Sequence, residues 1–266
     1  LYLSPETAAK IFAGEITRWN DPAIAKDNNR SVNQVVYKKD KKGDLVKDAK
    51  GNPVVLRTTK KNIAYTLPNQ PITVIYRSDR SGTSGNFTAW LRGVAPTTWT
   101  KPQNDTFVTA FPGNINAPGN IGRVVGASSS TGVAQLAAKT KYSITYAEVS
   151  YGTKYNLKTT AVGNASGNFA LPTGDATAAF LGSATTNPNG TLTFDYKTTN
   201  PAAYELGTTS YALVSTSYKD AAKGAAVKGL MTYVLNECAK KFPETEFAVI
   251  DGPLKAFNEA QIAKIK

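Results

Sequence analysis

The chain has 266 residues, 41% of them hydrophobic and 19% charged, a composition typical of a globular protein rather than a disordered one. Its net charge of +12 favours anionic partners, but the basic residues are scattered and we find no nucleic-acid-binding motif, so nucleic acid is not expected. It has no histidine and one cysteine, which excludes histidine-dependent catalysis, an intrachain disulfide and Cys₄ metal sites, and we expect neither metal nor cofactor.

The N-terminal residues predict two short helices. Ser4-Pro5-Glu6 combines a capping residue, a proline at the first helical position and an acid in the first turn, and Gly14 ends the apolar face that follows. Pro22 marks a turn into a second helix over 23–27. The chain starts abruptly at Leu1, without a signal peptide, and we therefore expect a further segment upstream.

Residues 31–66 predict a charged β-hairpin. Val32–Lys38 and Val54–Thr59 alternate as strands do, and turn signals stand between them at Gly43-Asp44 and Gly51-Asn52-Pro53. The simplest interpretation is a solvated excursion without a role. The alternative is a contact with a membrane surface, a cell wall or a protein partner.

The most informative stretch runs from Ile72 to Leu91. Ile72–Tyr76 is a β-branched apolar run typical of a buried strand, and Phe87–Leu91 belongs to an apolar-periodic helix. Between them, residues 77–85 are polar and rich in hydroxyl groups. A strand that passes into a helix in this way leaves the first helical N–H groups unpaired, at the positive end of the helix dipole.

Those unpaired amides predict an anion site. Ser81, Thr83 and Ser84 add hydroxyl donors, and Arg77 adds a guanidinium fork that suits a tetrahedral oxyanion. Gly82 lets a ligand approach the backbone, and Asp79 is placed to accept from Arg77 and hold its fork. The alternative is an ordinary capped helix with solvated arginines.

The remaining chain alternates further elements. We expect a helix over Ser128–Ala138, a strand over Ile144–Tyr146, a helix over Thr177–Leu181, a turn over Asn187–Gly190, a strand over Thr208–Val214, and helices over Lys223–Cys238, interrupted by Phe242-Pro243, and Leu254–Ile265. The hydroxyl groups at Ser128 are best interpreted as a helix cap, with a second anion contact as the alternative. Cys238 is predicted to be a buried small hydrophobe.

Three motifs resemble the substrate-binding protein of the high-affinity phosphate ABC importer, the solute-binding protein family found in the periplasm or on the cell surface. Arg77, Asp79, Ser81, Gly82 and Thr83 match its Arg-x-Asp-x-Ser-Gly-Thr wall of the phosphate cleft. Ile11–Ile24 is similar to its Gly-x-Ile-x-x-Trp-Asn-Asp-Pro-Ala-Ile element, and Ser143–Tyr151 to its Ile-Gly-Tyr-x-Glu step. The three occur in the family's order.

The resemblance implies an α/β fold of the periplasmic-binding-protein-like (type II) kind, in which two lobes close on a ligand. Residues 1–205 would form one complete lobe with the hairpin inserted, and 206–266 the C-terminal part of the second, beyond a hinge at Glu205–Thr209. About a third of the family's chain, at its N-terminus, has no counterpart here, including a carboxylate that accepts the phosphate proton. We expect a monomer, or a protein completed by that segment.

The resemblance also implies a function without catalysis. The protein would bind inorganic phosphate outside the membrane, in the periplasm or on the cell surface with a lipid anchor in a missing segment, and deliver it to the membrane permease of an ABC importer. Arg77 would be the charge partner, Ser81, Gly82 and Thr83 hydroxyl or amide donors, and Asp79 and Ser84 supporting groups. One alternative is an interaction protein that reuses the scaffold. The other is an enzyme acting on phosphate esters or peptides, with Ser81 or Ser84 as nucleophile and a lysine as base, which the missing histidine disfavours.

Overall fold

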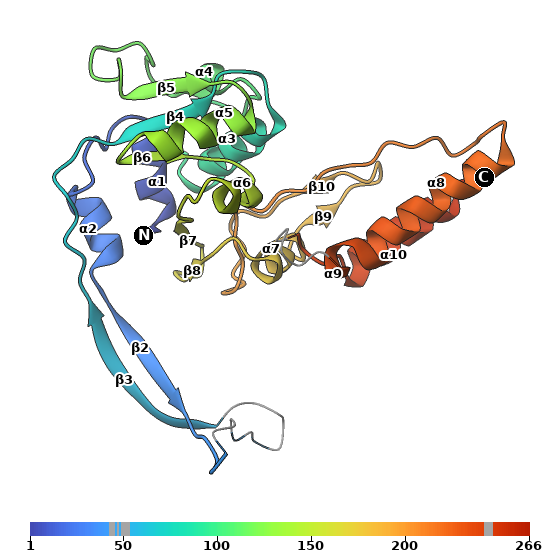
Figure 1. The fold of residues 1–266 in the computed structure, drawn as a ribbon, viewed down its shortest axis with the longest axis horizontal. Coiled ribbons are helices and arrows are strands. Elements are labelled where there is room, and N and C mark those ends of the chain that lie inside the picture. Colours follow the sequence, from blue (N-terminus) through green and yellow to red (C-terminus); the bar gives the residue numbers. More distant parts are fainter. Residues whose placement is uncertain (43–45, 47, 49–53, 242–246) are drawn as a thin grey trace.

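The computed structural model describes residues 1–42, 46, 48, 54–241 and 247–266 and has a mixed α/β fold (Figure 1). This confirms the predicted class. The fold contains a three-stranded parallel sheet in the order β5-β4-β6. Its strands are β4 (Thr73–Arg77), β5 (Val124–Ala127) and β6 (Ser143–Thr145). The middle strand is therefore the one that carries the predicted anion loop.

Helices cover both faces of β4. Val74 belongs to the main hydrophobic core, to which α3 (Gly82–Val94) contributes, and Ile75 packs with Val133 on α5 (Ser129–Lys139). Since neighbouring strand residues point to opposite faces, Arg77 shares the face of Ile75 and lies on the side of α5. The two helices thus begin on opposite sides of the same strand end.

The N-terminal elements support this core. The strand β1 (Tyr2–Leu3) precedes the two expected helices, α1 (Pro5–Phe12) and α2 (Pro22–Asn28). Ser4 caps α1, as predicted, because its side chain accepts from the Thr7 amide at 3.4 Å. A second small sheet has the order β1-β7-β8, in which β7 (Ala161–Gly163) runs parallel to β1 and β8 (Phe169–Ala170) runs antiparallel to β7.

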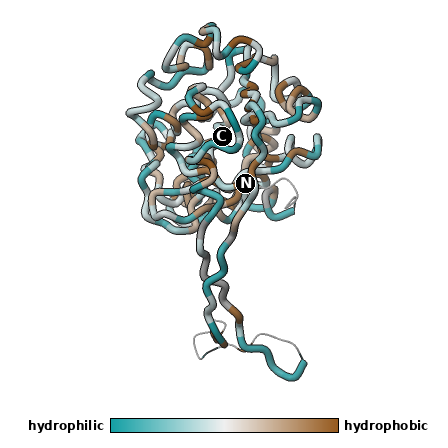
Figure 2. Tube along the Cα trace, turned by 90° about the vertical axis from the view of Figure 1, so that its left-hand side faces the viewer, coloured by the Kyte–Doolittle hydropathy of each residue, from teal (hydrophilic) through white to brown (hydrophobic). Residues whose placement is uncertain are grey.

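Residues 30–63, here called the arm, contain a long antiparallel pair of strands. The strand β2 (Arg30–Tyr37) pairs with β3 (Val55–Ile63), from Arg30 opposite Ile63 to Tyr37 opposite Val55. The two strands run away from the rest of the chain as a separate ribbon (Figures 1 and 2). The turn signals predicted at 43–44 and 51–53 lie outside the described residues.

The other helices and strands are short or lie toward the C-terminus. They are α4 (Phe107–Ala110), α6 (Val149–Lys154), α7 (Gly174–Leu181), the antiparallel strands β9 (Thr185–Thr186) and β10 (Leu192–Thr193), α8 (Ala221–Tyr233), the π-helix η1 (Val234–Cys238), α9 (Ala239–Lys241) and α10 (Gly252–Ala263). The predicted turn at 187–190 connects β9 to β10, and the predicted C-terminal helices are present. None of the described helices combines the length and the hydrophobicity that crossing a bilayer requires.

Two predictions in this region are wrong. Thr208–Val214 forms no strand, because no neighbouring strand pairs with it, and Leu213 is 96% exposed. Cys238 is half-buried rather than buried, because the C-terminal helices have few buried residues. The predicted interruption at 242–243 lies outside the described residues, and the division into lobes at residues 205 and 206 stays a prediction.

Candidate anion-binding site

The step from β4 to α3 is built as the sequence predicts. Ser81 takes an extended conformation (φ −152°, ψ 131°) as the N-cap of α3, and its Oγ accepts from the Thr83 amide at 3.1 Å. The Ser81 amide donates to the Asp105 carbonyl at 2.9 Å, which fixes the loop from outside. Serine is a favoured cap because its short side chain reaches the backbone two or three residues ahead.

Of the unpaired amides in the first turn of α3, that of Gly82 belongs to an exposed residue and that of Ser84 to a fully buried one. No acceptor within the described residues takes the N–H groups of Gly82 and Ser84, whereas that of Thr83 is already bonded to Ser81. The helix has 13 residues, so its dipole places partial positive charge at these donors. Among the predicted groups, Gly82 thus offers its amide, while Thr83 offers its hydroxyl.

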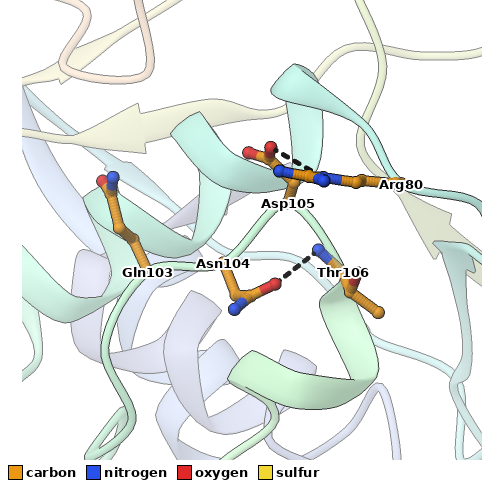
Figure 3. A pocket seen from close by; sticks show the side chains of 5 residues that line it. All are labelled: Arg80, Gln103, Asn104, Asp105 and Thr106. Atoms are coloured by element: carbon orange, nitrogen blue, oxygen red, sulfur yellow. Dashed lines mark hydrogen bonds and ion pairs between the residues drawn. The ribbon is translucent and has the colours of Figure 1, made fainter.

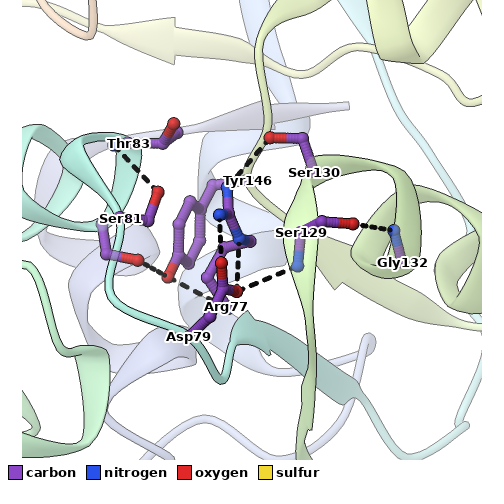
Figure 4. A network of polar contacts seen from close by, with 9 residues as sticks. Arg77, Asp79, Ser81, Thr83, Ser129, Ser130, Gly132 and Tyr146 are labelled. Carbon is purple, nitrogen blue, oxygen red and sulfur yellow. Dashed lines mark hydrogen bonds and ion pairs between the residues drawn. The ribbon is translucent and has the colours of Figure 1, made fainter.

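Arg77 is held by a carboxylate and a hydroxyl group (Figure 4). Its Nε and Nη2 donate to the two oxygens of Asp79 at 2.8 and 2.6 Å, and its Nη1 donates to Ser130 Oγ at 3.0 Å. The Arg77 side chain is only 11% exposed. Since a guanidinium carries five N–H donors and three are engaged here, two remain for a ligand.

Asp79 connects Arg77, at the end of β4, to the start of α5, and the space between the N-termini of α3 and α5 is here called the crevice. Its Oδ1 accepts from the Arg77 Nε and also from the Ser129 amide at 2.9 Å. The hydrogen bonds from Arg77, followed by that from the Ser129 amide, hold the pKa of Asp79 well below its usual range. The hydrogen bonds to Asp79 in turn raise the pKa of Arg77. Both groups therefore stay ionised at any physiological pH, and Asp79 has the orienting position that the sequence suggests.

The start of α5 lies beside this pair. Ser129 adopts a left-handed conformation (φ 65°), uncommon for a residue with a side chain, and its Oγ accepts from the Gly132 amide at 3.1 Å. The amides of Ser130 and Thr131 have no acceptor among the residues that the structure describes. Ser128 occupies the N-cap position of α5, but its side chain makes no capping hydrogen bond, whereas Ser130 contacts Arg77 directly.

Tyr146 forms the floor under the loop, and sequence reasoning did not assign it a role. Its hydroxyl lies 2.7 Å from Ser84 Oγ and accepts from the Arg77 amide at 3.2 Å. Its ring stacks on Phe87, with ring centroids 4.3 Å apart, and burial raises the pKa of Tyr146 to about 12. Ser84 is fully buried, so its side chain supports the loop rather than facing a ligand.

The second arginine of the loop, Arg80, lies beside Asp105 (Figure 3). Arg80 has an 83% exposed side chain, and its Nε is 3.4 Å from Asp105. It borders a polar hollow of about 430 Å³, also lined by Gln103, Asn104 and Thr106. Within the described chain, the Arg80 side chain forms no hydrogen bond or ion pair with Arg77 or Asp79.

The geometry brings two helix N-termini and one guanidinium to the carboxyl ends of adjacent parallel strands. Ligands of open α/β sheets bind at such strand ends, and helix N-termini favour anions. The free groups identified here are donors, which suits an oxyanion. No group of three or more acidic, cysteine or histidine side chains placed to hold a metal ion occurs among the described residues.

Comparison with known proteins places these features in a family. A family model described as "PBP superfamily domain" matches residues 1–237. Phosphate-binding protein PstS 2 of Mycobacterium tuberculosis (strain ATCC 25618 / H37Rv) is 30% identical over 237 residues, covering 87% of this chain and 52% of that protein. Phosphate-binding protein PstS of Methanocaldococcus jannaschii is 27% identical over 251 residues, covering 90% and 55%.

Solved structures share the fold. A high affinity periplasmic phosphate-binding protein (PfluDING) bound with phosphate aligns with a TM-score of 0.62 at 21% identity, over 97% of this chain and 64% of that one. A human phosphate binding apolipoprotein aligns with a TM-score of 0.57 at 17% identity, over 97% and 65%. The chain spans about half the length of the curated relatives described above. With its α/β fold and the match over residues 1–237, the chain belongs to the PBP superfamily.

Proposed function

We propose that this chain binds inorganic phosphate in the crevice between the N-termini of α3 and α5 and delivers it to the membrane permease of an ABC importer, without catalysis. The observation that carries the proposal is the position of Arg77, which is fixed by Asp79 and Ser130 beside two helix N-termini with unpaired amides. The relatives named above, which are phosphate-binding proteins, support the same ligand.

Phosphate suits the donors that are free. The amide of Gly82 on one helix, those of Ser130 and Thr131 on the other, and two N–H groups of Arg77 can all donate to its oxygens. The hydroxyl groups of Ser81 and Thr83 lie in the same first turn of α3. A tetrahedral anion accepts in several directions at once, so donors from two helices can bind it together.

The helix N-termini have to supply much of the positive charge that a bound phosphate requires. Because Asp79 already neutralises Arg77, the added anion depends on the partial charges of two helix N-termini, each equivalent to roughly half a unit charge. The Asp79 carboxylate is occupied by Arg77 and the Ser129 amide, so we expect it to be a poor acceptor for a phosphate proton. We therefore expect this crevice alone to discriminate weakly between phosphate and sulfate.

Delivery to a permease fits a protein outside the membrane, in the periplasm or on the cell surface. We propose that residues 1–205 form the lobe that carries Arg77 and that 206–266 contribute to the second lobe, which the rest of the family's length would complete. Closure of two lobes would exclude water from the crevice and strengthen each hydrogen bond. We expect the working protein to be monomeric.

Calorimetric titration with phosphate tests this function. Arg77→Ala should weaken binding by at least about 100-fold, because it removes a charged donor from a largely buried position. The matched control is Arg80→Ala, which removes the same charge three residues away from an exposed position and should leave affinity within about threefold. A parent protein that gives neither heat nor a thermal shift with phosphate would favour the alternative of an interaction protein.

A further inference from the structure

The arm carries a charge out of proportion to its length. Residues 30–63 contain ten lysines and arginines and three aspartates, which gives seven of the twelve net positive charges of the whole chain. Neither the proposed phosphate site nor the hydrophobic core uses these residues. The arm therefore has a property that binding a small anion at Arg77 does not explain.

The charge is presented at a distance from the rest of the protein. Eight residues of β2 in extended conformation reach about 25 Å. At the far end of this ribbon, Lys38, Lys39, Lys41 and Lys42 are all exposed, and no ion pair among the described residues involves them. The Lys42 amide donates to Asp40 Oδ1 at 2.8 Å, so the chain turns within the lysine run.

Apolar side chains accompany these lysines. Tyr37 pairs with Val55 across the ribbon, and the register shift after Val36 leaves Leu56 as the extra residue. Their exposed fractions are 41%, 52% and 62% for Tyr37, Val55 and Leu56. Figure 2 shows the arm as mainly hydrophilic, with a short hydrophobic stretch toward its far end. An isolated ribbon has no core in which to bury such residues, so they stay in water at a free-energy cost.

We propose that the far end of the arm docks on an anionic lipid surface. Lys38, Lys39, Lys41 and Lys42 contact the headgroup phosphates, and Tyr37, Val55 and Leu56 enter the interface between headgroups and acyl chains. Clustered lysines next to a membrane attract anionic lipid, and tyrosine and aliphatic side chains favour the boundary of the bilayer.

The combination of side chains distinguishes lipid from other anionic partners. A soluble polyanion would need the lysines but would gain nothing from exposed Val55 and Leu56. A protein partner would bury more apolar surface than three side chains at the end of a ribbon provide. A bilayer requires only a shallow apolar contact together with positive charge, and this is what the described residues offer.

Vesicle co-sedimentation of the full chain tests the proposal. The probes are vesicles of phosphatidylcholine alone and with about 30% phosphatidylglycerol, at roughly 0.15 M salt. We expect binding only to the anionic vesicles. Replacing the four lysines by glutamine should weaken it at least about 100-fold, and Val55→Thr with Leu56→Ser about tenfold. The matched control changes four exposed lysines outside the arm to glutamine and should leave binding unchanged: Lys101, Lys139, Lys141 and Lys158.

Each contrary result overturns the proposal. A parent protein that stays in the supernatant with anionic vesicles would end it, as would binding that survives the change of the four arm lysines. Binding that is insensitive to Val55 and Leu56, and that soluble polyphosphate displaces fully, would identify a polyanion rather than lipid as the partner. Because these residues lie outside the hydrophobic core, circular dichroism and phosphate titration of each variant should match those of the parent.

Discussion

Replacing Arg77 by lysine separates charge from geometry at the proposed site. The arginine spans two partners, with Nε and Nη2 on Asp79 and Nη1 on Ser130. A lysine ammonium keeps the charge but cannot reproduce the flat fork that contacts both partners, so at least one charge-assisted hydrogen bond is lost. Such a bond contributes about 1.5–3 kcal/mol. For the free energy of unfolding we expect a loss in the lower part of this range, because the Asp79 side chain is 36% exposed and water screens its charge.

The expected loss of phosphate affinity is about 1.4–2.8 kcal/mol, a factor of roughly 10 to 100. Two causes contribute to it: fewer N–H donors reach the anion, and a flexible ammonium must be ordered when the anion binds. The assay is calorimetric titration with phosphate for the parent, Arg77→Lys and the control Arg80→Lys. An Arg77→Lys variant with parental affinity would refute the reasoning, because charge alone would then be sufficient.

Further predictions concern the residues around the loop and one buried acid. Ser130→Ala removes the acceptor of Arg77 Nη1 and should weaken phosphate binding by about two- to tenfold in the same titration. Ser84→Ala removes a buried partner of Tyr146 and should lower the free energy of unfolding by about 1–2 kcal/mol in urea, so an unchanged midpoint would contradict the contact. Glu205 is 2% exposed, and burial raises its pKa from 4.5 to about 7. As pH rises, the carboxyl group of Glu205 loses its proton in the unfolded chain before it does so in the folded one, so the free energy of unfolding should fall by up to about 3 kcal/mol between pH 4.5 and pH 7. Urea titrations at several pH values measure this fall, and Glu205→Gln should abolish it.

Local sequence was sufficient to predict the strand-to-helix step at the site. A β-branched run bounded by a proline indicates a buried strand, and a serine before a glycine and a hydroxyl residue is a strong helix start. The structure has β4 and α3 at these places, with Ser81 as the cap. The contact between Asp79 and Arg77 also follows from spacing, because residues two apart on an extended chain lie on one side.

The contribution of α5 could not be predicted in the same way. Ser129 and Ser130 are more than fifty positions from Arg77, and their contacts depend on β5 pairing with β4 in parallel. A hydroxyl-rich helix start is common, so its composition alone favoured the interpretation as a cap. The same limit applies to Tyr146, which reaches the loop only because β6 pairs with the other edge of β4.

The incorrect strand at 208–214 has a related cause. Its alternating, β-favouring residues satisfy a local pattern, but a strand forms only where another strand offers backbone partners. The Tyr211 hydroxyl oxygen instead accepts a hydrogen bond from the Leu192 amide at 2.9 Å. Which strands pair depends on the whole fold, so it cannot be predicted from the local sequence.

A crystal structure of the protein with phosphate tests the central claim most directly. We expect the anion within hydrogen-bond distance of the Gly82 amide, of the Ser130 or Thr131 amide, and of an Arg77 N–H group, with Asp79 still bonded to Arg77. Phosphate bound elsewhere on the protein, or an empty crevice in crystals grown at a concentration that saturates the calorimetric titration, would contradict it.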